Sequence, residues 1–290
     1  MASNVSPMPF ERPTIGPVDT PYFEMSNWSR TALPWANNLL MCVMQGNPIE
    51  EAYSGVPPIL GCAPLTMEEL HRDFEREHTL LNQTEWPGAV TEMFERKVQQ
   101  LPHTSITRVV CLGLGSFSTC NRWRPRSRDQ LVCLTILVEI LNRYHAIPKQ
   151  HVYVQDPGFI NEDVKFLKSL GYTYLPDPAA FNHINRTTLV FGPVLECNIN
   201  TKIFALCHPA LYIGSSLEWV IATETESLTG AYASVAYITL EEERLAETVK
   251  YRNKSEVENM PGIEGRKSMD KLEIRWLRVE DEQQDTEDKG

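Results

Sequence analysis

The sequence predicts an α/β protein with a Rossmann-like domain: a three-layer α/β/α arrangement around a mainly parallel sheet, preceded by a helical N-terminal extension. Two observations support this prediction. From residue 107 onward, short apolar runs end in glycine or other turn residues, as buried parallel strands do. Segments with helical periodicity separate these runs, and strands that alternate with helices form right-handed βαβ units. The expected strand order is 3-2-1-4-5.

The composition limits the classes of protein to consider. The chain has 290 residues, of which 42% are hydrophobic and 22% charged, as in globular proteins with a sizeable core. Its formal net charge of −11 argues against nucleic acid as a partner. The seven cysteines are odd in number and form no C-x-x-C pair, which favours reduced thiols in the cytoplasm or the nucleus. The longest apolar runs are too short to cross a bilayer, so no membrane is expected as a partner.

The chain divides into three predicted parts. Residues 1–65 are rich in Pro, Asn and Ser and form either an extended arm ordered by its aromatic residues or a disordered tail. Residues 66–240 hold the Rossmann-like domain with its preceding helices. Residues 241–290 hold a helical segment and an acidic tail over 280–290.

The elements of the domain follow in order. A capping box, Thr66 to Glu69, opens a first helix, and a second helix starts after Trp86 and Pro87 and ends near residue 100. A second capping box, Ser127 to Gln130, opens the helix over 131–144, and Asn161 caps the helix over 162–170, with Gly171 after its end. Strands are predicted over 107–112, 151–155, 172–175, 187–191 and 210–213, with short helical segments over 179–182 and 201–207. Residues 231–240 form either a last strand or a helix, and residues 241–250 a helix.

The turn after the first strand is the leading ligand-site candidate. Gly113, Gly115 and Ser116 stand where a dinucleotide or S-adenosylmethionine loop would begin, because glycine lets the backbone approach a ligand closely. However, Ser118 replaces the third glycine of G-x-G-x-x-G, and the next helix is predicted to begin only near Ser127. A tight turn without a ligand explains the glycines equally well.

Other strand ends add residues to this site. Asp156 ends the second strand, where an acid can accept hydrogen bonds from ribose hydroxyls or can simply start a turn with Pro157. Ligands in such sheets bind at the carboxyl ends of the strands, between the first and fourth strands. We therefore expect a small-molecule ligand at this switch point to contact the following residues: Gly113, Gly115, Ser116, Gln155, Asp156, Pro193, Gly214 and Ser215. S-adenosylmethionine and a nucleotide are the candidate cofactors.

Two further patterns are less informative. One is a loop with four arginines at alternate positions, Arg122, Arg124, Arg126 and Arg128. These side chains could form a basic patch that binds an anion, but we favour the interpretation that they pair with carboxylates of the same chain. The spacing of the cysteines and histidines at 183–208 fits no zinc pattern, so we expect no metal site. No nucleophile–base pair is identifiable by spacing.

The order of the motifs resembles one known family. Six motifs in this order are similar to those of the Sensitivity-to-Red-Light-Reduced (SRR-like) domain family. They are V-V-C-L-G-L-G-S at 109–116, S-R-x-Q-L at 127–131, Q-D-P-x-F at 155–159, L-G at 170–171, L-V-F-x-P at 189–193 and I-G-x-S at 213–216. The resemblance covers about residues 105–220. It implies a eukaryotic, Rossmann-like protein with a regulatory role, linked in the family to circadian rhythm and light signalling in cytoplasm and nucleus. The Pro-rich arm and acidic tail suit a fungal member.

The sequence departs from the family pattern at the fourth strand. Where the family shows P-H-C, this chain has Pro193, Val194 and Leu195, so any chemistry of that His-Cys pair is absent here. The leading hypothesis is therefore a non-enzymatic regulatory or adaptor protein with protein partners. The alternative is a small-molecule enzyme, such as an S-adenosylmethionine-dependent methyltransferase or a nucleotide-dependent enzyme. A third hypothesis is a scaffold that acts through its arm and tail.

Overall fold

The computed structural model describes residues 63–100, 105–119, 124–228, 235–266, 269 and 271–278. The predicted acidic tail over 280–290, and all but the last three residues of the predicted arm over 1–65, lie outside the described residues. The domain boundaries given above stay predictions.

The centre of the fold is a seven-stranded sheet with the order β3-β2-β1-β4-β5-β7-β6. Its first five members are parallel and have the predicted order 3-2-1-4-5, which confirms the Rossmann-like fold class. β7 then pairs antiparallel with β5, and β6 pairs antiparallel with β7. The strands are β1 Arg108–Leu112, β2 Val152–Gln155, β3 Thr173–Tyr174, β4 Thr188–Gly192, β5 Leu211–Gly214, β6 Ser255–Asn259 and β7 Glu273–Leu277.

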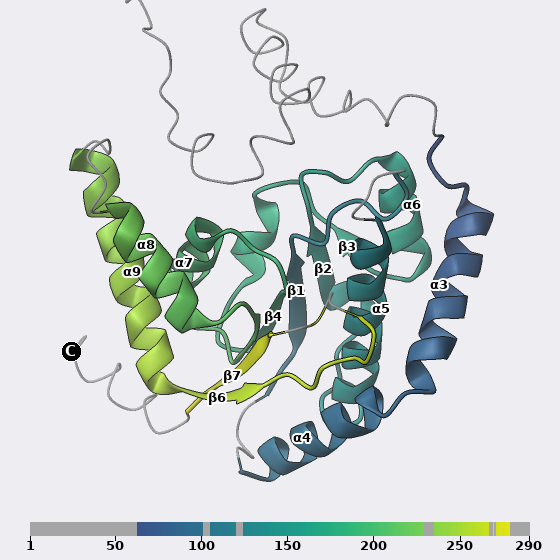
Figure 1. The fold of residues 1–290 in the computed structure, drawn as a ribbon, viewed down its shortest axis with the longest axis horizontal. Helices are drawn as coiled ribbons and strands as arrows, with labels where there is room; N and C mark the ends of the chain where they lie inside the picture. The colour runs from purple at the N-terminus through teal and green to yellow at the C-terminus, as the bar shows by residue number, and fades with distance from the viewer. Residues whose placement is uncertain are drawn as a thin grey trace, which may run out of the picture.

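Helices cover both faces of the sheet (Figure 1). One layer consists of α3 Met67–Asn82, α4 Trp86–Gln100, α5 Arg124–Leu141 and α6 Asn161–Ser169. The other consists of α7 Cys197–Leu206, α8 Leu217–Leu228 and α9 Val235–Lys254, with the short 3₁₀ helix η2 Ala179–His183. A second 3₁₀ helix, η1 Lys149–His151, precedes β2.

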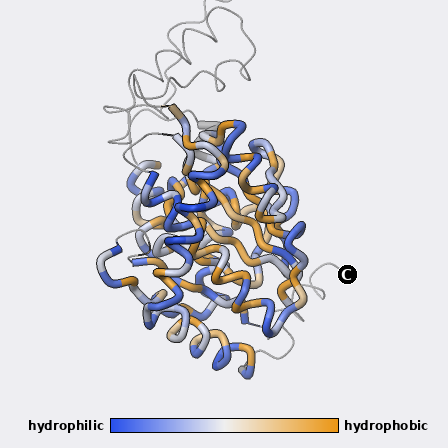
Figure 2. Tube along the Cα trace, turned by 90° about the vertical axis from the view of Figure 1, so that its right-hand side faces the viewer, coloured by the Kyte–Doolittle hydropathy of each residue, from blue (hydrophilic) through white to orange (hydrophobic). Residues whose placement is uncertain are grey.

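Alternate residues of each strand face the two layers, as the pleat requires. Val109 and Cys111 of β1 belong to the apolar cluster under α3 to α6, and Val110 and Leu112 belong to the cluster under α7 to α9. The parallel strands at the centre of the sheet therefore read as continuous apolar runs, which appear as orange stretches inside the molecule in Figure 2. Among the described residues, no helix has both the length and the apolar content that crossing a bilayer requires.

The local signals at the helix ends were partly right. Thr66 caps α3 with both hydrogen bonds of the capping box, as predicted. The capping box at Ser127 is wrong, because α5 already begins at Arg124 and Ser127 is a buried residue inside the helix. Pro125 explains the earlier start, since proline is tolerated in a first turn that needs no N–H donor there.

The other boundary differences are also local. Asn161 lies inside α6, and the capping position is Ile160, whose N–H is bound by Asp163. Gly171 follows the helix with a φ of 85°, as predicted. The helix expected over 201–207 begins earlier, at Cys197, and the ambiguous stretch before residue 241 continues as α9 from Val235. β6 and β7 were not predicted at all.

Candidate functional site

The predicted switch point exists in the structure. The last residues of four parallel strands lie opposite one another in the sheet. Cys111 of β1 pairs with Phe191 of β4, and Leu112 of β1 pairs with Gln155 of β2. Gly192 of β4 pairs with Gly214 of β5. Because these strands are parallel, their carboxyl ends meet at one edge of the sheet. The loops that carry the predicted site residues therefore start side by side.

The first of these loops is a tight turn. Gly113 and Gly115 have φ values of 74° and 71°, in the region that favours glycine. The Gly113 N–H donates to the Gln155 carbonyl over 3.2 Å and so continues the β1–β2 pairing. Residues 113–123 separate β1 from α5, so the turn does not open directly into the helix, in contrast to a dinucleotide-binding loop.

Asp156 binds this loop. Its Oδ2 accepts the Gly115 N–H at 2.7 Å and its Oδ1 accepts the Gly158 N–H at 2.7 Å. Burial raises the pKa of this carboxyl, although both N–H hydrogen bonds act in the opposite direction. The carboxylate that the sequence offered as a ribose ligand is thus engaged by the protein's own backbone.

A second carboxylate, Asp163, was not predicted from the sequence. Its Oδ1 accepts N–H groups of Phe117 at 3.2 Å and Ser118 at 2.9 Å, and its Oδ2 accepts the Ile160 N–H at 2.9 Å. The side chain is fully buried, and burial raises its pKa against the lowering effect of these bonds. The only available signal was an acid in the first turn of a helix, which is also common without a functional role.

Together, Asp156 and Asp163 occupy three backbone donors of the loop after β1. A phosphate group bound at such a loop would use donors of this kind. Here the protein supplies its own anions to them. Ser116, another predicted site residue, is buried and accepts the Thr119 N–H at 3.1 Å.

The side chain of Leu195 packs against the glycines at the carboxyl ends of β1 and β4. A Cβ atom added to Gly113 would lie 2.6 Å from Leu195 Cδ2, and one added to Gly192 would lie 2.9 Å from Leu195 Cγ. Leu195 itself is 8% exposed. The leucine that departs from the family's P-H-C pattern therefore packs directly against the glycines of the switch point, next to the buried Pro193.

The remaining predicted residues also make internal contacts. Gln155 donates to Asp177 Oδ1 at 2.7 Å and accepts the Ala180 N–H at 2.8 Å, which fixes the start of η2. The Ser215 carbonyl accepts the Tyr212 hydroxyl at 3.4 Å. A Cβ on Gly214 would overlap the phenol group of Tyr212 and would lie 2.9 Å from the Gly192 carbonyl oxygen, so this glycine makes room for the Tyr212 side chain and the end of β4.

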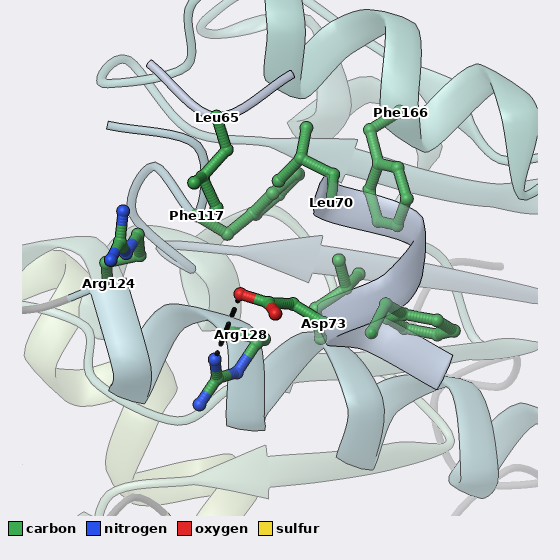
Figure 3. Close-up of a pocket in the computed structure, with 9 residues that line it drawn as sticks. Leu65, Leu70, Asp73, Phe117, Arg124, Arg128 and Phe166 are labelled. Carbon is green, nitrogen blue, oxygen red and sulfur yellow. Dashed lines mark ion pairs between the residues drawn. The ribbon is translucent and has the colours of Figure 1, made fainter. Parts of the chain in front are cut away.

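A small cavity lies beside the loop, between α3, α5 and α6. Phe117, Phe166 and Leu70 line it, and Arg124 and Arg128 stand at its rim (Figure 3). Its volume is about 10 Å³, which is room for about one water molecule. Ligand pockets for small molecules typically measure about 300–1,000 Å³, so this cavity holds no cofactor.

The arginine-rich segment agrees in part with the interpretation that we favoured. Arg128 lies 3.6 Å from Asp73 and 3.4 Å from Glu77 on α3, so it pairs with carboxylates of the chain. Arg122 lies outside the described residues.

The cysteines of the rejected metal pattern lie far apart. Cys197 begins α7 and Cys207 directly follows its end, about 15 Å away along the helix. Among the residues that the structure describes, no group of three or more His, Cys, Asp or Glu side chains is arranged to hold a metal ion.

The chain has several similarities to known proteins. A mouse (Mus musculus) SRR1-like protein is 36% identical over 73 residues, which span 25% of this chain and 26% of the mouse protein. A crystal structure of a Thermoplasma acidophilum protein matches 72% of this chain and 97% of its own, with 12% identity and a TM-score of 0.30. The family model of the SRR1 domain matches residues 65–282, which include the loop after β1, the switch point and all seven strands. The chain therefore belongs to the SRR1 domain family.

Proposed function

We propose that this SRR1-domain protein is a non-enzymatic regulatory or adaptor protein that acts by binding other proteins. The observation that carries the proposal is the filled switch point: Leu195 packs on Gly113 and Gly192 where this architecture usually admits a ligand. The family resemblance supports a regulatory role in cytoplasm or nucleus, in the area of circadian rhythm and light signalling.

The electrostatics of the loop support the same proposal. Asp156 and Asp163 accept the N–H groups of Gly115, Phe117 and Ser118. A nucleotide phosphate would have to displace these carboxylates, and its own charge would be repelled by them at close range. S-adenosylmethionine lacks that phosphate, but its binding would still require Leu195 to move away from Gly113 and Gly192.

The test is a thermal-shift screen of the full chain against adenine and nicotinamide nucleotides, S-adenosylmethionine, S-adenosylhomocysteine and haem. We expect no change in melting temperature with any of them. A ligand at 100 times its Kd would stabilise the protein by about 2.7 kcal/mol, which is a shift of several degrees. A clear shift with one compound would contradict the proposal.

A matched pair of variants locates any such shift. Asp156→Ala removes the carboxylate predicted as a ribose ligand, and Glu162→Ala removes an acid in the first turn of α6. A shift that is lost in Asp156→Ala and kept in Glu162→Ala would locate the ligand at the predicted site and favour the enzyme alternative. No shift in either variant or in the wild type supports the adaptor function.

A further inference from the structure

The strand β6 is an open edge of the sheet. In the part of the chain that the structure describes, β6 pairs only with β7, and the opposite edge, β3, has two residues. An edge strand presents unpaired N–H and C=O groups that can pair with another chain, and natural proteins usually protect such edges with charges, proline or bulges.

The register identifies which backbone groups face outward. Met260 N–H donates to the Leu272 carbonyl at 2.8 Å, and Arg278 N–H donates to the Lys254 carbonyl at 3.0 Å. In an antiparallel pair, every second residue bonds to its partner strand. The even-numbered residues of β6 therefore bond to β7, and the backbone groups of Ser255, Val257 and Asn259 point away from it.

Among the residues that the structure describes, the usual protection is missing at this edge. β6 contains no proline or glycine, and Val257 is 47% exposed. Its two charged residues are neutralised by α4: Lys97 Nζ lies 2.7 Å from Glu256 and 3.0 Å from Glu258, and Arg96 lies 2.7 Å from Glu258. The edge thus combines free hydrogen-bonding groups, an exposed apolar side chain and locally balanced charge, although the whole chain carries a net charge of −11.

The sequence of β6, S-E-V-E-N, is nearly symmetric about Val257. If two copies of β6 pair antiparallel about a two-fold axis at this residue, Val257 faces Val257 and Ser255 faces Asn259. Each of these pairs exchanges two hydrogen bonds through the outward-facing groups. On the other face, Glu256 lies opposite Glu258 of the second copy. Arg96 and Lys97 of both copies offset this repulsion, which would otherwise disfavour the pairing.

We propose that β6 pairs with β6 of a second copy of this chain, so that two sheets join into one continuous sheet across a two-fold axis at Val257. The interface is isologous, as in most symmetric dimers. The contact is a single pair of short strands, so the dimer is a weak one that forms at high protein concentration. This proposal does not depend on the function proposed above.

Analytical ultracentrifugation of the full chain over a wide concentration range tests the proposal. We expect the average mass to rise from that of the 33.1 kDa monomer towards twice that value. Val257→Lys places two ammonium groups face to face on the axis and should weaken the dimer by at least about tenfold. Because Val257 is already half exposed, the variant should keep its fold, which circular dichroism checks.

Leu206→Lys is the matched control, since Leu206 is 56% exposed at the end of α7 and is not part of β6. It should dimerise like the wild type. A wild-type chain that stays monomeric at all concentrations would overturn the proposal. The same holds if Val257→Lys dimerises as strongly as the wild type, or if Leu206→Lys loses the dimer to the same extent.

Discussion

At the scale of single residues, the contact between Leu195 and Gly192 decides whether the switch point is closed. Gly192 lies in β4 without a positive φ, so its need for glycine comes from the neighbouring side chain alone. Gly192→Ala should destabilise the protein by about 1–3 kcal/mol because the new methyl group overlaps Leu195. Leu195→Ala should cost about 2–5 kcal/mol through lost burial and the cavity left behind. Urea unfolding measures both changes.

The double variant separates this contact from other effects. In Gly192→Ala/Leu195→Ala, the methyl group added at position 192 occupies space that the leucine has left, so the combined loss should be smaller than the sum of the two single losses. Strict additivity would show that Leu195 does not pack on Gly192 as described. Gly88→Ala serves as a control, because a Cβ there meets no atom within 4 Å.

The residue scale also shows where the sequence is informative about the site. The order of motifs located the strand ends correctly, so Gly113, Asp156 and Gly214 do meet at one edge. What occupies that edge could not be predicted from the sequence, because an acid after a strand looks the same whether it binds a ribose or a backbone N–H. The only signal for Asp163 was its place in the first turn of a helix, and its contact with Ser118 could not be predicted because it joins residues 45 positions apart.

At the scale of elements, β6 and β7 show why a strand can escape prediction. β7 reads E-I-R-W-L, and its central residue, Arg275, is 1% exposed. A charged residue at a buried position breaks the apolar run that identifies a core strand. The structure accommodates it because Arg275 bonds to Glu273 at 2.9 Å and to Glu218 of α8 at 2.7 Å. This ion-pair network ties the start of α8 to the sheet.

Removing the arginine should therefore be costly. Arg275→Ala leaves Glu273 with an uncompensated charge beneath α8, and breaking a buried pair in this way costs about 3–5 kcal/mol. Lys250→Ala is the control: the side chains of Lys250 and Glu247 are 59% and 37% exposed in their ion pair, and exposed pairs contribute about 1 kcal/mol or less. The comparison is made by urea unfolding. Equal losses in the two variants would contradict the role assigned to Arg275.

At the scale of the whole molecule, a pair of buried carboxyls makes stability depend on pH. Glu224 of α8 is 7% exposed, and Glu241 of α9 is 2% exposed and pairs with Arg244. Burial, and then the charge of Glu241, raise the pKa of Glu224 to about 7, whereas its ordinary value is 4.5. The helix layer of α7, α8 and α9 thus holds a carboxyl that prefers to be protonated.

The direction of the pH effect follows from linkage. Between pH 4.5 and about 7, the folded chain keeps the Glu224 proton that the unfolded chain releases, so the contribution of Glu224 to stability falls as pH rises and is lost above pH 7.

Glu224→Gln stays neutral throughout. Relative to the wild type, it should gain about 1–2 kcal/mol between pH 5 and pH 8, a value that allows for partial solvent screening. Urea unfolding at a series of pH values measures the gain. Glu242→Gln makes the same substitution at an exposed position on α9 and serves as the control. If Glu224→Gln behaves like this control, the proton on Glu224 does not set the stability of the helix layer.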